Sequence, residues 1–120
     1  MQQAAQACER SGDAFGRAMV KGNLSLVFAE LGLYRHACRI GEEVVVLCAR
    51  MGARRHLALQ LGGILTWKIA LGELDSARAR WPEYDALVTT LAEPQTQNLR
   101  VLLTSALALA VTVTSQIETK

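Results

Sequence analysis

Apolar residues in this chain recur with the spacing of one face of an α-helix. Leu24, Val27 and Leu31, for example, stand at positions i, i+3 and i+7, which places their side chains on one side of a helix. Between such stretches a glycine returns about every twenty residues. Glycine is favoured where a helix ends because it adopts a left-handed conformation without a Cβ penalty. The pattern therefore predicts an all-α chain.

The glycines that recur about every twenty residues divide the chain into about six predicted helices. These glycines are Gly12, Gly32, Gly52 and Gly72. We expect helices over residues 2–10, 14–31, 34–50, 54–71, 74–91 and 95–113. Short loops of about two to four residues make neighbouring helices antiparallel, which gives the stacked helix hairpins of an α-solenoid. Pro94 marks the start of the last helix, whereas Pro82 predicts that one helix ends at Trp81 and another begins at Pro82.

The sequence also repeats itself at an offset of forty positions. The clearest matches place Cys8, Arg10 and Gly12 on Cys48, Arg50 and Gly52, Leu31-Gly32 on Leu71-Gly72, and Ala37 on Ala77. We therefore predict one domain over residues 1–120. It would consist of a partial repeat (1–12), two repeats (13–52 and 53–92) and a partial or degraded repeat (93–120), in which Val111-Thr112 replaces the Leu-Gly pair.

The first full repeat resembles a tetratricopeptide repeat. The residues that carry this resemblance are Leu24, Ser25, Phe28, Gly32, Tyr34 and Ala37. The second repeat is a weaker match, because it keeps Ile64, Gly72, Leu74 and Ala77 but has Lys68 where Phe28 stood. The long period resembles variants found in sensor regions of large bacterial transcriptional activators and cyclase-associated regulators. In this family the alanine must be small because the two helices of a hairpin touch there.

The resemblance also implies a binding surface. In tetratricopeptide proteins the first helices of successive hairpins line a concave groove that accepts a peptide, an extended segment or a helix. The residues implied to face that groove are Asn23, Leu26, Glu30, Gly63, Thr66 and Ala70. Glu30 occupies a place where carboxylate-clamping members carry a lysine, which argues against an acidic C-terminal tail as the ligand. The alternative is a concave face that is merely solvated.

The function expected from these features is a non-enzymatic scaffold for protein–protein contact, within a cytoplasmic bacterial regulatory or signalling protein. The alternative is an effector-sensing segment of a transcriptional regulator or cyclase-associated protein that binds a small molecule. A third interpretation is a homo-oligomer formed through the apolar last helix, which predicts burial of Leu103, Leu107 and Ala110 between copies.

Composition fits one globular helical domain. The chain has 120 residues, of which 51% are hydrophobic and 20% charged, so it can bury a core and is not a disordered chain. A net charge of +2 gives little reason to expect a nucleic-acid partner, and the basic cluster of Arg50, Arg54, Arg55 and His56 lacks interleaved aromatic residues. The uncharged stretch 101–117 is too short and too polar for a membrane span. Three cysteines without a disulfide pattern favour the cytosol.

No constellation of residues predicts catalysis or metal binding. His36 and Cys38 lie two positions apart, so on a helix they point in different directions. No acidic residue is evident beside His56 to orient it as a base, and the histidines and cysteines lack the paired spacing of zinc ligands. Gly62 and Gly63 stand inside a predicted helix and indicate close packing rather than a phosphate loop. We therefore expect no enzyme activity, no metal and no cofactor.

Overall fold

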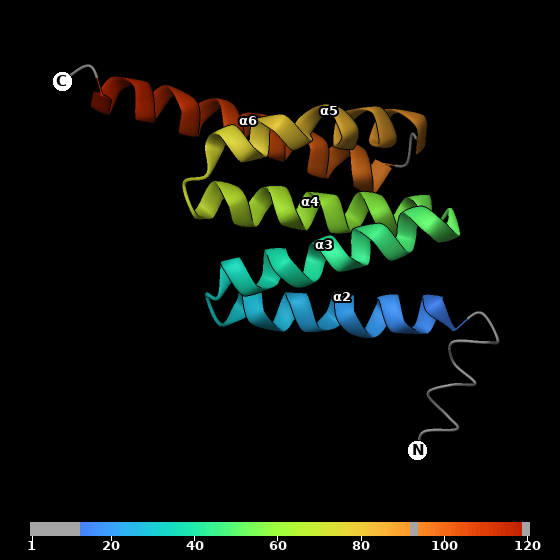
Figure 1. Cartoon of the computed structure of the whole chain (residues 1–120). Coiled ribbons are helices and arrows are strands. Elements are labelled where there is room, and N and C mark those ends of the chain that lie inside the picture. Colours follow the sequence, from blue (N-terminus) through green and yellow to red (C-terminus); the bar gives the residue numbers. More distant parts are fainter. Residues whose placement is uncertain (1–12, 92–93, 119–120) are drawn as a thin grey trace.

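Five α-helices follow one another in the described part of the chain, and each packs against the next (Figure 1). The computed structural model describes residues 13–91 and 94–118. The helices are α2 (Ala14–Glu30), α3 (Tyr34–Met51), α4 (Arg54–Ala70), α5 (Leu74–Leu91) and α6 (Pro94–Glu118). Every element of the described residues is a helix, which confirms the all-α prediction, and consecutive helices run antiparallel (Figure 1). The helix expected over residues 2–10 lies outside the described residues.

Three turns of the array close with the same hydrogen bonds. Gly32, Gly52 and Gly72 have φ angles of 78°, 69° and 77°. At each turn the glycine N–H donates to the carbonyl three residues back, and the next N–H donates to the carbonyl five residues back. This pair of bonds is the Schellman motif, which satisfies carbonyls at the end of a helix. The glycine stops predicted at these three positions are confirmed, whereas Gly12 lies outside the described residues.

Helix α4 supplies the largest share of the buried core. One apolar cluster joins four helices through Ala37 and Val45 of α3, Ala58, Leu61, Ile64, Leu65 and Trp67 of α4, Ala77, Tyr84 and Val88 of α5, and Leu103 of α6. A smaller cluster joins Ala18 of α2 to Val44 and Cys48 of α3. Ala37 and Ala77 are both fully buried where helices meet, which explains why these positions hold a small residue.

Glycine also allows close approach of helices to α4. A Cβ atom on Gly41 of α3 would lie only 3.0 Å from Cγ1 of Ile64. A Cβ atom on Gly62 of α4 would lie 2.9 Å from Cδ2 of Leu99 and 3.4 Å from Cε1 of Tyr84. Neither site has room for a larger side chain, so both glycines are packing positions. For Gly62 this agrees with the interpretation from the sequence.

A buried polar contact connects α2 with α4. Ser25 is fully buried and its hydroxyl donates to the carbonyl oxygen of Gly22 over 2.6 Å. The Nε2 amide of Gln60 donates to the Ser25 Oγ atom over 3.1 Å. Because both groups would lose solvation without a partner, this pairing favours one position of α2 relative to α4.

The break expected at Pro82 is wrong. Helix α5 continues from Leu74 through Pro82 to Leu91 as one element. Proline removes the hydrogen bond to the carbonyl four residues earlier, which belongs to Arg78. Pro82 and Arg78 are both exposed, so water can satisfy that carbonyl and the helix does not need to end.

The last helix is longer than expected. Helix α6 begins at Pro94, as predicted, but it continues to Glu118, well beyond residue 113. Its sequence lacks the Leu-Gly pair that stops α2 and α4, and Val111-Thr112 stands in that place. In Figure 1 the C-terminal part of α6 extends past the ends of the neighbouring helices. The expected interface residues Leu103, Leu107 and Ala110 are buried or half-buried within this chain, so Leu103 cannot serve as the oligomer contact.

Candidate interaction surface

The six residues implied by the family resemblance stand at equivalent places on two helices. Asn23, Leu26 and Glu30 lie on α2, and all three are exposed, with Leu26 at 53%. Their spacing of three and four positions keeps them on one side of the helix. The same spacing applies to Gly63, Thr66 and Ala70 of α4, each forty positions further along. Structure therefore places the two sets on corresponding sides of the first helices of successive hairpins.

On α4 the three residues differ in how freely they reach solvent. Thr66 and Ala70 are exposed, whereas Gly63 is half-buried. A Cβ atom on Gly63 would lie 3.2 Å from the Trp67 ring, so that ring occupies the space a side chain would need. The Thr66 hydroxyl donates to the Gly62 carbonyl oxygen over 2.8 Å, so it is already satisfied within its own helix. Gly63 therefore serves packing as well as the surface.

Leu59 extends this surface and was missed by sequence reasoning. It lies on α4 one turn before Gly63, and its spacing to Gly63, Thr66 and Ala70 places it on the same side. Its side chain is 45% exposed. The signal was present as an i, i+4, i+7 row, but a leucine in such a row is ordinarily assigned to the core. We call the surface formed by Asn23, Leu26, Glu30, Leu59, Gly63, Thr66 and Ala70 the first-helix face.

Charge separates the first-helix face from the outer sides of the second helices. Glu30 is its single charged member among the seven residues that define it. The charged residues of α3 and α5 are Arg35, Arg39, Glu42, Glu43 and Arg50, and Asp75, Arg78, Arg80, Glu83 and Asp85. Many of these form ion pairs, such as Arg80 with Glu42 at 2.8 Å and with Glu83 at 2.9 Å. The seven residues of the first-helix face therefore carry one charge, whereas α3 and α5 carry ten, several of them in ion pairs.

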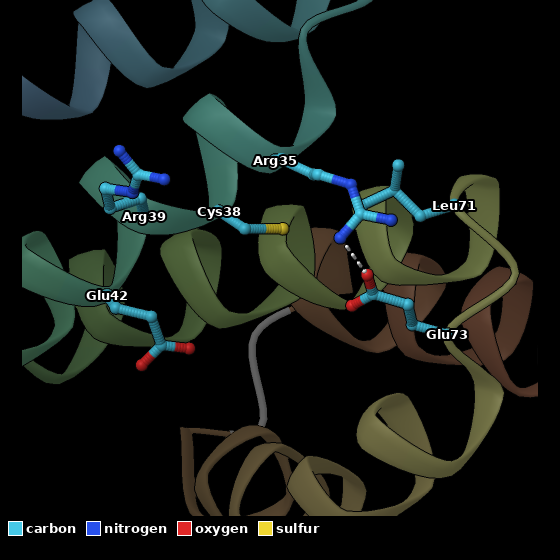
Figure 2. A pocket seen from close by; sticks show the side chains of 6 residues that line it. All are labelled: Arg35, Cys38, Arg39, Glu42, Leu71 and Glu73. Carbon is cyan, nitrogen blue, oxygen red and sulfur yellow. Dashed lines mark ion pairs between the residues drawn. The ribbon is translucent and has the colours of Figure 1, made fainter.

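A hollow of about 320 Å³ lies where the start of α3 meets the turn between α4 and α5 (Figure 2). Arg35 and Glu73 form an ion pair across it, with 3.0 Å between Nη1 and Oε1. Glu42 and Arg39 add one charge of each sign to its wall. Because these four charges balance, the hollow offers no net field to attract an anion or a cation. None of the residues of the first-helix face lines it.

The two described thiols have the properties of packing residues. Burial raises the pKa of the Cys48 thiol, which is 1% exposed. Burial also raises the pKa of the Cys38 thiol, and the nearby Lys68 ammonium opposes that rise only in part. Because the thiolate is the reactive form, both groups are protonated and poorly nucleophilic at neutral pH.

The histidine rings pack against phenylalanine rings. His36 lies against Phe28, with ring centroids 5.6 Å apart, and His56 lies edge-on to Phe15 at 5.0 Å. Among the described residues no group of three or more histidine, cysteine or carboxylate side chains stands close enough to hold a metal ion. The arrangement of these residues is that of helix packing.

Two further findings concern the molecule as a whole. Within residues 13–91 and 94–118, no helix has the length and apolar character that crossing a membrane requires. Comparison of the chain with protein-family models, curated proteins and solved structures finds no match in any of the three. The function must therefore be inferred from the surfaces described above.

Proposed function

We propose that this chain is a non-enzymatic protein-interaction scaffold, in which the first-helix face holds an extended or helical segment of a partner protein. A cytoplasmic regulatory or signalling protein of a bacterium is the context that the resemblance to tetratricopeptide repeats suggests. The observation that carries the proposal is the exposure of Leu26 and Leu59 on an almost uncharged surface spread over two successive first helices. Exposed apolar surface of this kind favours contact with another protein.

The chemistry of the first-helix face specifies the partner segment. Burying the exposed halves of Leu26 and Leu59 would contribute about 1 kcal/mol each, so the segment needs apolar side chains opposite them. The Asn23 amide has donors and an acceptor that can bond to the backbone of an extended segment. Glu30 repels a carboxylate, so the segment is not an acidic tail. Small residues at Gly63 and Ala70 leave room for the partner to approach α4 closely.

Variants of the first-helix face test the proposal. Leu26→Glu and Asn23→Ala should each reduce capture of a bound partner, because the first inserts a charge into the apolar contact and the second removes the amide. Val46→Glu on α3 is the matched control, since Val46 is 49% exposed and lies on a different helix. Captured proteins are identified by mass spectrometry, and circular dichroism checks that each variant is helical. Equal capture of every partner by all three variants would refute the role of this face.

Sensing of a small effector is the second candidate function. A hollow of about 470 Å³ beside Arg54, Leu57 and Leu87 lies within the usual size range of small-molecule sites. It combines apolar walls with the oppositely charged Arg54 and Glu83 side chains, so a zwitterionic compound with an apolar body is the class of effector it would suit. A thermal-shift screen with such compounds tests this candidate, because a ligand that binds only the folded state raises the melting temperature. Loss of that shift in Arg54→Ala would locate the site.

A further inference from the structure

Glu30 is an acidic side chain at a place where a helix disfavours one. It is the last residue of α2, and no basic residue stands in the last turn of that helix. The carbonyl end of a helix carries partial negative charge, so it repels a carboxylate. Glu30 is exposed and makes no ion pair with a described residue, whereas Glu42 and Glu43 of α3 are each paired with a cation. This unfavourable charge belongs to the first-helix face.

The opposite end of the first-helix face carries a charge of the other sign. Arg55 lies one turn before Leu59 on α4, so it continues the row of residues that α4 contributes to that face. Arg55 is exposed, and the first turn of α4 contains no acidic residue. The amide end of a helix carries partial positive charge, so an arginine is disfavoured there as well. Each end of the face thus holds a charge that its own helix disfavours.

Helices α2 and α4 run in the same direction, so their dipoles add to these charges (Figure 1). Phe15 of α2 stands forty positions before Arg55, and its ring centroid lies 5.0 Å from that of His56 on α4. This contact places the start of α2 beside the start of α4. Two positive helix ends therefore lie on the Arg55 side, and the two negative helix ends lie on the Glu30 side. The first-helix face is positive at one end and negative at the other.

The lysines of these two helices do not offset this polarity. Lys21 of α2 pairs with Glu43 of α3 at 2.9 Å. Lys68 lies in the last turn of α4 but contacts the Ser76 hydroxyl of α5. Both lysines therefore point toward second helices and away from the first-helix face. Natural chains break such local preferences mainly at functional sites, so the charges at the two ends of the face point to a ligand that compensates them.

We propose that the first-helix face binds an amphipathic helix of a partner protein, which runs antiparallel to α2 and α4. This inference rests on the proposed function and specifies its ligand. The amide end of the bound helix, with basic residues in its first turn, lies at Glu30. Its carbonyl end, with acidic residues in its last turn, lies at Arg55. An extended segment gains less from this polarity, because strands contribute only a small net dipole. The span from Phe15 to Glu30 corresponds to a bound helix of about 15 residues, or about 22 Å.

Two synthetic peptides test the charges and the orientation. Each has about 16 residues, leucines along one side, blocked ends and a hydrocarbon cross-link that holds it helical. The charged peptide carries lysines in its first turn and glutamates in its last turn, whereas the neutral peptide carries glutamines at these positions. In fluorescence anisotropy at about 50 mM salt, the charged peptide should bind about fivefold more tightly than the neutral one. A benzophenone at its amino end should cross-link to residues near Glu30, as mapped by mass spectrometry.

Charge reversal at either end of the face should weaken binding without harming the fold. Glu30→Lys and Arg55→Glu should each lower affinity for the charged peptide about fivefold and leave the neutral peptide unaffected. Both substitutions place a charge that the helix dipole favours, so these variants should melt at or above the wild-type temperature. Arg78→Glu is the matched control, since it makes the same charge change at an exposed position of α5 and should bind like the wild type.

The possible failures separate this proposal from the proposed function. Cross-linking near Arg55, equal binding of the two peptides, or unchanged affinity in Glu30→Lys and Arg55→Glu would overturn the proposal, as would no binding of the charged peptide. If both peptides bind equally and Leu26→Glu abolishes their binding, the proposed function stands while the charge-directed orientation falls. Equal capture of partners by the variants of the first-helix face, in the experiment given above, is the result that refutes the proposed function itself.

Discussion

The same substitution, glycine to alanine, should have opposite effects at two positions of this fold. Gly52 ends α3 with a φ of 69°, and a Cβ atom built on it would meet nothing within 4 Å. Gly16 lies inside α2 and does not have a positive φ. A Cβ atom there would also meet nothing within 4 Å. Because neither change causes a clash, the difference between them reports backbone conformation alone.

The expected magnitudes follow from that conformation. Alanine in the left-handed region costs roughly 1–2 kcal/mol, so Gly52→Ala should lower the free energy of unfolding by about that amount. Alanine inside a helix is favoured over glycine by about 0.5–1 kcal/mol, so Gly16→Ala should raise it. The two variants should therefore differ in the free energy of unfolding by about 2 kcal/mol.

Urea denaturation, with helix content followed by far-ultraviolet circular dichroism, measures these changes in the free energy of unfolding. Each kcal/mol corresponds to a shift of roughly 4 °C in the melting temperature for a domain of this size. Gly32→Ala and Gly72→Ala should match Gly52→Ala, because all three turns share the same hydrogen bonds and open space around the glycine. A Gly52→Ala variant as stable as the wild type would refute the assignment of these turns.

Three further predictions concern the buried core. Tyr84→Phe should raise the free energy of unfolding by about 1 kcal/mol in urea denaturation, because the buried Tyr84 hydroxyl has no hydrogen-bond partner among the described residues; a decrease would show that the hydroxyl is bonded. Ala77→Leu should lower it by about 1–3 kcal/mol, whereas the exposed Ala79→Leu should have little effect, and equal effects would contradict the packing at Ala77. Ionisation of the Cys48 thiol should leave the free energy of unfolding unchanged below the ordinary thiol pKa of 9.0. As pH rises from there through the higher pKa of the folded state, the free energy of unfolding should fall, because the unfolded chain loses the proton first. Cys48→Ala should reduce that decline in urea titrations at alkaline pH, and an unchanged decline would count against burial of the thiol.

Much of the fold could be predicted because its signals are local. The starts of α2, α3, α4 and α5 agree with the predicted helices. For α3, α4 and α5 the reason is that a glycine in the left-handed region both ends the preceding helix and fixes the turn that follows. Pro82 misled the prediction because the energy of a proline depends on whether the freed carbonyl is exposed, which the sequence does not state. The end of α6 was missed because no glycine or proline marks it.

The candidate surfaces were harder to predict because they depend on which neighbours a helix has. Leu24, Val27 and Leu31 form the apolar face that defined α2 in the sequence, yet the structure leaves all three substantially exposed. Their counterparts Ile64 and Trp67 are buried, and Gly41 of α3 lies against Ile64. An apolar period reveals that a face is suited to packing, but it does not reveal whether the packing partner belongs to the same chain.

Each first helix in this array has several distinct sides, and this division explains the surfaces together. One side contacts the second helix of its own hairpin, as Ala18 of α2 does with Val44 of α3. Another is suited to the helix that precedes it, as Ile64 of α4 shows with α3. A further side belongs to the first-helix face, of which every residue except Gly63 is exposed. Stacking can satisfy the other sides, so the first-helix face is the side that α2 and α4 both leave open.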